Sequence, residues 1–144
     1  DEHEIIGALQ RIGTTKSAPV DNFNQGGGSA LIDIETGKIG KLTSLFYTDD
    51  HGNRIFYEKH PDTNSVICGK VIPNWDKLKT EIANTTKKLP FFKYIAWDIV
   101  VQDSGFAVIE INMKSSLNVF QIHRGLRNEL LGKKYREAGY LENE

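Results

Sequence analysis

The sequence predicts an α+β fold with a mostly antiparallel sheet and two main helices. Short apolar segments separated by turn residues recur along the first half of the chain, and two more flank a tight turn near residue 104. The segments after residues 73 and 117 instead place apolar residues with a helical period. Strands joined by tight turns pair antiparallel, because a parallel pair needs a long crossover connection.

Composition and length narrow the class of protein. With 144 residues, 39% of them hydrophobic and 26% charged, we expect a single domain over residues 1–144. A net charge of -1 provides no basic field for a nucleic acid or an anionic membrane. No apolar run approaches the roughly 20 residues of a membrane span. The single cysteine, Cys68, excludes an internal disulfide and fits a reducing compartment, so we expect a cytoplasmic protein.

The first half of the chain is predicted to alternate strands with loops. Strands are expected over residues 4–12, 29–34 and 38–47, with extended segments at 54–57 and 65–72. Residues 13–28 form a breaker-rich loop, and loops of about fifteen residues are usually functional or disordered. Gly26-Gly27-Gly28 is not followed by Gly-Lys-Ser/Thr, so it does not match the phosphate-loop motif. We expect a flexible linker or lid here.

The first helix is expected to follow Pro73, with Asn74 as N-cap and Pro90 as its end. Its apolar stripe comprises Trp75, Leu78, Ile82 and Leu89.

The second helix is expected to begin near Asn118, with Gln121 as its capping-box partner, and to end before Gly139. Its apolar stripe comprises Val119, Ile122, Leu126 and Leu130.

A β-hairpin between residues 94 and 113 groups three polar side chains. A three-residue loop ending in a left-handed Gly105 would set Gln102 opposite Phe106. The same register sets Asp98 opposite Glu110 and Ala96 opposite Asn112. Because side chains alternate with period two, Asp98, Glu110 and Asn112 then share one face. That face would also carry Tyr94, Ala96, Val100, Phe106 and Val108.

Two opposed carboxylates repel, so solvent, a basic neighbour or a metal must offset them. A solvated outer face is one explanation. However, apolar residues occupy both faces, which predicts that both faces are covered and that a bare acid pair is costly. Asp, Glu and Asn offer only oxygen ligands, which suits Mg²⁺ on substrate phosphates and disfavours zinc. The pattern therefore favours a divalent-cation site.

Trp97-Asp98-Ile99 and Ile109-Glu110-Ile111-Asn112 resemble the metal-binding end of the ATP-grasp fold. The most similar variant is the ATP-grasp domain associated with sugar transfer and polysaccharide biosynthesis. The resemblance extends over nearly the whole chain, through residues 11–13, 20–27, 33–37, 60–63, 72–73 and 121.

The resemblance implies ATP and Mg²⁺ as cofactors. Asp98 and Glu110 would hold one magnesium ion, and Glu110 and Asn112 a second. Arg11 would contact a phosphate or acylphosphate as a catalytic residue, and Lys114 is a second such candidate for a phosphate or a substrate carboxylate.

The loop formed by residues 21–28 would close over the substrate, with Asp21, Asn22, Gly26 and Gly27 binding the cofactor. The pair Asp21-Asn22 is also a common turn former. His60 is either a phosphate or substrate contact or a surface histidine, and the spacing does not choose between these.

Two departures concern substrate recognition. Many ATP-grasp ligases carry Pro-Gly shortly after Glu-x-Asn, where this chain has 113–116 as Met-Lys-Ser-Ser, and arginine two residues before the metal-binding Asp, where this chain has Ala96. The family fold also binds adenine between two subdomains. This chain resembles the C-terminal subdomain, so we expect an upstream subdomain before Asp1 and an inactive chain without it.

The resulting hypothesis is an ATP- and Mg-dependent ligase. It would activate a small-molecule or sugar-linked carboxylate as an acylphosphate for attack by an amine or similar nucleophile, in cell-surface polysaccharide or glycoconjugate biosynthesis. The alternative is a non-catalytic nucleotide- or sugar-binding module in which the acid pair is structural.

Overall fold

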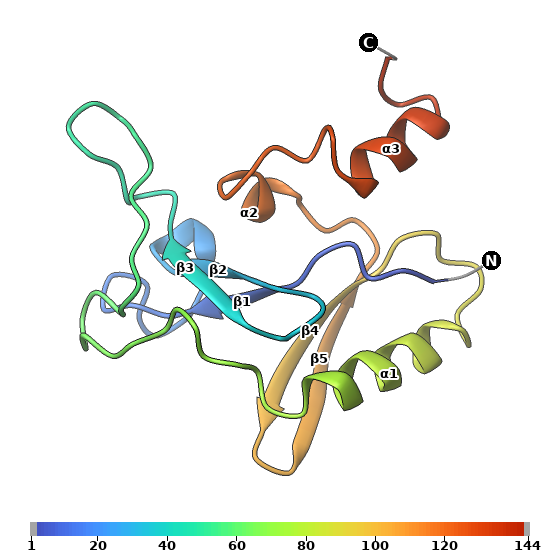
Figure 1. Ribbon diagram of the computed structural model, residues 1–144, viewed down its shortest axis with the longest axis horizontal. Helices are drawn as coiled ribbons and strands as arrows, with labels where there is room; N and C mark the ends of the chain where they lie inside the picture. Colours follow the sequence, from blue (N-terminus) through green and yellow to red (C-terminus); the bar gives the residue numbers. More distant parts are fainter. Residues whose placement is uncertain (1–2, 143–144) are drawn as a thin grey trace.

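The computed structural model describes residues 3–142 and shows an α+β architecture with two antiparallel sheets (Figure 1). The first sheet has the order β1-β2-β3, and the second is the β4-β5 hairpin. Within the described residues, three α-helices and one 3-10 helix complete the fold, which confirms the predicted fold class. The elements are β1 (Leu9–Ile12), the 3-10 helix η1 (Phe23–Gln25), β2 (Gly28–Ile32), β3 (Ile39–Thr43), α1 (Trp75–Thr86), β4 (Ala96–Gln102), β5 (Gly105–Asn112), α2 (Asn118–Gln121) and α3 (Leu130–Glu137).

The three-stranded sheet separates the core from a second, polar face. Gln10, Ala30 and Leu42 are register partners, and Ala30 and Leu42 are fully buried. The core cluster on this side combines Ala30, Ile32, Ile39, Ile72, Trp75 and Leu78, against which Ile99, Val101 and Phe106 of the hairpin pack. The next register positions, Arg11, Ser29 and Thr43, point to the other face because side chains alternate along a strand.

The strands are shorter than the sequence pattern predicts. The segment 4–12 pairs only over Leu9–Ile12, and β2 and β3 stop at Ile32 and Thr43. The segments 54–57 and 65–72 join the sheet only through isolated bridges, such as Leu42 to Tyr57 and Lys38 to Val71. Left-handed turn residues between these bridges, including Gly52, Asn64 and Gly69, redirect the chain before a ladder can extend.

Helix α1 buries three of the four predicted stripe residues, while Leu89 lies beyond its end and is partly buried. Trp75, Leu78 and Ile82 are all buried, and the Trp75 Nε1–H donates to the Ile34 carbonyl at 2.8 Å. The helix ends at Thr86, before the predicted stop at Pro90. Asn74 occupies the predicted N-cap position. However, its backbone is left-handed (φ 55°) and its side chain makes no capping hydrogen bond, so the expected side-chain cap does not form.

The predicted last helix is in fact two short helices. Asn118–Gln121 forms α2 and Leu130–Glu137 forms α3, with an irregular segment between them that contains Gly125. The N-cap position of α2 is Leu117, whose side chain cannot cap, so the capping box does not form. Gly139 lies just past α3 with φ 76°, as predicted for a helix C-terminus.

Gly37 allows α1 to pack close to the turn after β2. We therefore expect a substitution at Gly37 to destabilise the protein more than the same substitution at Gly52. Gly37 and Gly52 both have left-handed backbones, at φ 72° and 82°. A Cβ on Gly37 would lie 2.5 Å from Trp75 Cγ, whereas one on Gly52 would meet nothing within 4 Å. We expect Gly52→Ala to cost about 1 kcal/mol of unfolding free energy from backbone strain alone. Gly37→Ala should cost about 1–3 kcal/mol more, because the ring must move.

Urea denaturation of the two variants measures this difference. Equal losses of stability would contradict the close packing of Trp75 on Gly37.

Candidate functional site

The β4-β5 hairpin places the three predicted metal ligands together. Asp98 is the register partner of Glu110, and Ala96 is the partner of Asn112. Residues two apart on a strand point to the same side, so the carboxylates and the amide share one face. Glu110 is exposed, while Asp98 and Asn112 are partly buried. The predicted pairing of these residues is therefore confirmed.

The turn that produces this pairing differs from the prediction. Gly105 belongs to β5 and pairs with Gln102, so the hairpin has a two-residue turn at Asp103-Ser104. Val100 consequently faces Ala107. A β-bulge then leaves Ile109 without a partner, between the Ile99–Val108 and Asp98–Glu110 pairs. The extra residue reverses the shift that the shorter turn introduces.

The bulge also changes the predicted faces of the hairpin. Phe106 pairs with Val101 and packs on the core, so it does not share the face of the acids. Val108 pairs with Ile99 and likewise lies on the face opposite the acids. The expectation that both faces are covered is wrong for the described residues, because Val100 on the acid-bearing face is 47% exposed and Val108 on the other face is 41% exposed. Solvent reaches the exposed Glu110 on the acid-bearing face and screens part of the carboxylate repulsion.

Arg11 connects the acid pair to the loop after β1. One guanidinium nitrogen lies 2.7 Å from Asp21 Oδ1, and the other lies 3.4 Å from Asp98 Oδ2. All three side chains are partly exposed, so the ion pairs contribute little stability by themselves. Their main effect is to position side chains, because the Arg11 guanidinium holds Asp21 of the loop and Asp98 of the hairpin close together. The pairing of Arg11 with Asp98 spans 87 residues, and no local pattern in the sequence signals it.

The loop 13–28 is tied to the sheet, contrary to the expected flexible linker. The Thr14 hydroxyl donates to the Gly26 carbonyl at 3.0 Å, and the Ser44 hydroxyl donates to the Gly27 carbonyl at 2.9 Å. Gly26 is left-handed (φ 105°), and a Cβ on Gly27 would lie 2.5 Å from the Asp21 carbonyl oxygen. The glycines are thus buried packing residues. A contact with a cofactor remains a prediction.

Asn22 and His60 both have structural roles in this region. The Asn22 side chain accepts from the Asn24 N–H and caps η1, in agreement with a turn-forming role. His60 Nε2 lies 2.8 Å from the Gly13 carbonyl oxygen, and Asp62 accepts from the Thr15 N–H at 2.7 Å. His60 therefore has a structural role, because the segment 60–62 holds the start of the loop in place through these hydrogen bonds. Its contact with phosphate stays a prediction.

The structure gathers some of the predicted site residues and separates others. Arg11, Asp21 and Asp98 are in contact, and Glu110 and Asn112 lie beside them on the hairpin. Lys114 follows β5 directly and is exposed. Within residues 3–142, Lys114 makes no ion pair or hydrogen bond that links it to this group.

Sequence reasoning missed a buried serine–histidine pair beside Arg11. Ser29, the register partner of Arg11, is fully buried, and its Oγ lies 2.9 Å from His123 Nε2. Burial, reinforced by the nearby Arg124 and Arg54, lowers the pKa of His123 from 6.5 to about 4. The neutral imidazole therefore fastens the segment after α2 to β2. No local pattern in the sequence signals this contact, because Ser29 and His123 are 94 residues apart.

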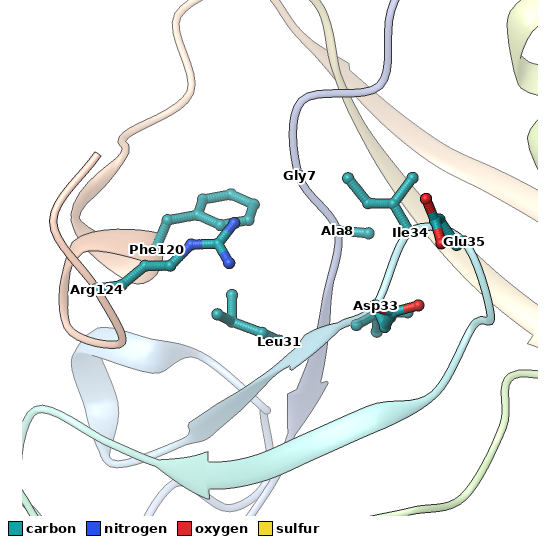
Figure 2. A pocket seen from close by; sticks show the side chains of 9 residues that line it. Gly7, Ala8, Leu31, Asp33, Ile34, Glu35, Phe120 and Arg124 are labelled. Carbon is teal, nitrogen blue, oxygen red and sulfur yellow. The ribbon is translucent and has the colours of Figure 1, made fainter. Parts of the chain in front are cut away.

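A cavity of about 260 Å³ lies on the same side of the sheet as α2 (Figure 2). Its lining comprises Gly7, Ala8, Leu31, Ile32, Asp33, Ile34, Glu35, Phe120 and Arg124. It contains none of the predicted metal or phosphate residues.

The donor set of the hairpin fits magnesium. Within residues 3–142, no group of three or more His, Cys, Asp or Glu side chains is arranged to hold a metal ion. The Asp98–Glu110 pair supplies two carboxylates, with the Asn112 amide oxygen as a third donor. Mg²⁺ takes oxygen ligands and usually keeps one or two carboxylates plus substrate phosphates and water. Such a partial set therefore fits a cation that binds together with a nucleotide.

The sugar-transfer associated ATP-grasp family matches residues 1–133, so the chain belongs to that family. No curated protein matches the chain, and no solved structure does. In the described part of the chain, none of the helices has the length and apolar character needed to cross a bilayer.

The Ser29–His123 contact predicts a pH-dependent stability. Because the folded pKa of about 4 lies below the unfolded value of 6.5, the unfolded state binds the extra proton between these values. The contribution is fully present above pH 6.5 and is lost as the pH falls toward 4. Discounted for solvent screening at this half-buried ring, we expect about 1–2 kcal/mol.

Urea denaturation at pH 7 and pH 4.5 compares the protein with His123→Gln, which keeps a hydrogen-bonding amide but does not titrate. The variant should lose less stability on acidification. The same loss in both proteins would show that His123 is not buried as a neutral ring.

Proposed function

We propose that the chain is the metal- and phosphate-binding part of an ATP-dependent ligase that acts in cell-surface polysaccharide or glycoconjugate biosynthesis. The observation that carries this proposal is the opposed pair of Asp98 and Glu110, with Asn112 two residues farther on the same face. Membership of the sugar-transfer associated ATP-grasp family supports the class of reaction and its biological setting.

The chemistry proposed is the activation of a carboxylate by ATP. A carboxylate oxygen of the substrate attacks the γ-phosphorus, the bond to the β,γ-bridging oxygen breaks, and ADP leaves. An amine or similar nucleophile then attacks the acyl carbon, and inorganic phosphate leaves with the C–O bond electrons while the amine loses a proton. Asp98, Glu110 and Asn112 would hold Mg²⁺, which supplies neutralisation of phosphate charge when bound.

Arg11 is placed to assist this step with its own charge. Its guanidinium already lies against Asp98, so phosphate oxygens held near the acid pair would come within its reach. A guanidinium binds phosphate with two parallel hydrogen bonds, and this geometry restrains the transferred group. The contact with Asp21 would keep the Arg11 side chain extended toward the acids before the nucleotide binds. Arg11 thus orients, while the acids hold the cation.

The remaining roles follow from position. The loop residues Asp21, Asn22, Gly26 and Gly27 would line the nucleotide side of Arg11, and His60 would support them through the Gly13 carbonyl. Lys114, exposed after β5, would contact a substrate carboxylate or phosphate. Adenine would bind between this domain and a second subdomain of the intact protein, which would act in the cytoplasm.

One observation favours the alternative of a non-catalytic binding module. Arg11 lies 3.4 Å from Asp98 and supplies a positive charge to the acid pair without any metal. In that case the pair would be structural, and the protein would bind nucleotide or sugar without turning it over.

Replacement of Glu110 distinguishes the two functions. Glu110→Gln keeps the shape of the side chain but removes the carboxylate that would belong to both cation sites. We expect ATP turnover by the intact protein to fall more than about 100-fold, because loss of a direct metal ligand should exceed the 10–100-fold effect of outer-shell changes. The measurement is ADP release at a fixed Mg²⁺ concentration.

Glu81→Gln is the matched control, since Glu81 is an exposed acid on α1 that pairs with Lys77, away from the hairpin. It should keep full turnover. ATP consumption retained by Glu110→Gln would overturn the metal assignment, and ATP binding without turnover by the unaltered protein would favour the binding module.

A further inference from the structure

The cavity beside α2 is a candidate small-molecule site, and none of the predicted metal ligands lines it. It lies between the segment that enters β1, the end of β2, and the Phe120 and Arg124 side chains (Figure 2). Its volume of about 260 Å³ equals the share of roughly nine water molecules at about 30 Å³ each. A space of this size takes a monosaccharide or an amino acid.

The wall formed by the α2 segment is held in place by two contacts. The Phe120 ring packs on Gly7 so closely that a Cβ there would lie 2.7 Å from Phe120 Cε1. Three residues after Phe120, His123 is bonded to the buried Ser29 on β2. The Phe120 ring thus packs on the segment that enters β1, and the backbone next to Arg124 is fastened to β2 through His123.

Arg124 is the basic side chain of the cavity and lies on its α2 side (Figure 2). Glu129 contacts Arg124 at 3.3 Å through one nitrogen, which leaves other N–H groups of the planar fork for a ligand. The carboxyl group of Asp33 points away from Arg124, and its Oδ1 accepts from the N–H and the hydroxyl of Thr36 (Figure 2).

We propose that this cavity binds a small molecule that carries a carboxylate on a compact carbon skeleton. The carboxylate would face Arg124, which binds planar anions with two parallel hydrogen bonds. The apolar walls of Ala8, Leu31 and Phe120 would contact the carbon skeleton. Sugar acids and amino acids share this chemistry.

This inference deepens the proposed function, and it rests on that function only for the role of the ligand as a ligase substrate. Leu31 is the register partner of Leu9, one pair along the same sheet face from Arg11 and Ser29. Residues two apart on a strand are separated by about 6.6 Å, so the cavity and the phosphate-binding arginine are neighbours. Binding to the cavity needs neither ATP nor Mg²⁺, so it can be tested separately.

The test is a titration of the ¹⁵N-labelled intact protein, without ATP or Mg²⁺, followed by amide chemical shifts. The probes are glucuronate and L-alanine, with glucose as the neutral control for hydroxyl groups alone. Saturable shifts at residues 31–35 and 120–124 are expected for at least one of the first two probes, and glucuronate alone would indicate a sugar acid. Glucose should give no saturable shift there.

Arg124→Gln should weaken binding of the active probe by about tenfold or more, as expected for the loss of a hydrogen bond to a charged group. Arg124→Lys should retain part of the affinity, because it keeps the charge. Lys133→Gln is the control, since it removes a basic side chain paired with Glu137 outside the cavity. The spectra of the variants also report their folding.

Two results would overturn the proposal. One is the absence of saturable shifts in the cavity with both glucuronate and L-alanine. The other is unchanged affinity in a folded Arg124→Gln variant. Neither result depends on ATP turnover, so failure here is distinguishable from failure of the ligase assignment.

Discussion

Two carboxylates of like charge face each other across the β4-β5 hairpin, and the rest of the site is arranged around that pairing. A two-residue turn alone would have put Asp98 out of register with Glu110, and the bulge at Ile109 restores the register. The sheet geometry thus holds an electrostatically unfavourable pair that the turn by itself would have separated. Solvent and Arg11 offset part of the repulsion, and a bound cation would offset it further.

Arg11 joins that pair to the rest of the fold. It projects from β1 on the face opposite the core and reaches Asp98 on the hairpin and Asp21 in the loop. The loop is in turn fixed by Thr14, Ser44 and His60 through its backbone carbonyls. Ser29, beside Arg11, fastens the segment after α2, which forms one wall of the cavity. The acid pair, the loop and the cavity wall are therefore all linked to Arg11 and Ser29, whereas the apolar side of the hairpin packs on the core.

Local patterns in the sequence predicted the parts of this arrangement that local chemistry determines. The α+β class and the buried positions Trp75, Leu78 and Ile82 of α1 follow from periodicity. The turn residues predict a three-residue loop, whereas the hairpin has a two-residue turn, and the predicted pairing of Asp98 with Glu110 holds only because a bulge at Ile109 compensates. The ion pair of Arg11 with Asp98 and the Ser29–His123 contact join residues 87 and 94 positions apart, and tertiary packing alone brings them together. His123 also lies in the irregular segment between α2 and α3, where the sequence pattern predicts a continuous helix.

The central claim is that Asp98, Glu110 and Asn112 hold a divalent cation against the phosphates of ATP. The most direct measurement is the crystal structure of the intact protein grown with Mn²⁺ and a non-hydrolysable ATP analogue, with the metal located by its anomalous scattering. The account predicts an anomalous peak within bonding distance of the Asp98 and Glu110 carboxylates. A bound analogue whose metal lies elsewhere, with Arg11 still on Asp98 and no metal at the hairpin, would contradict it.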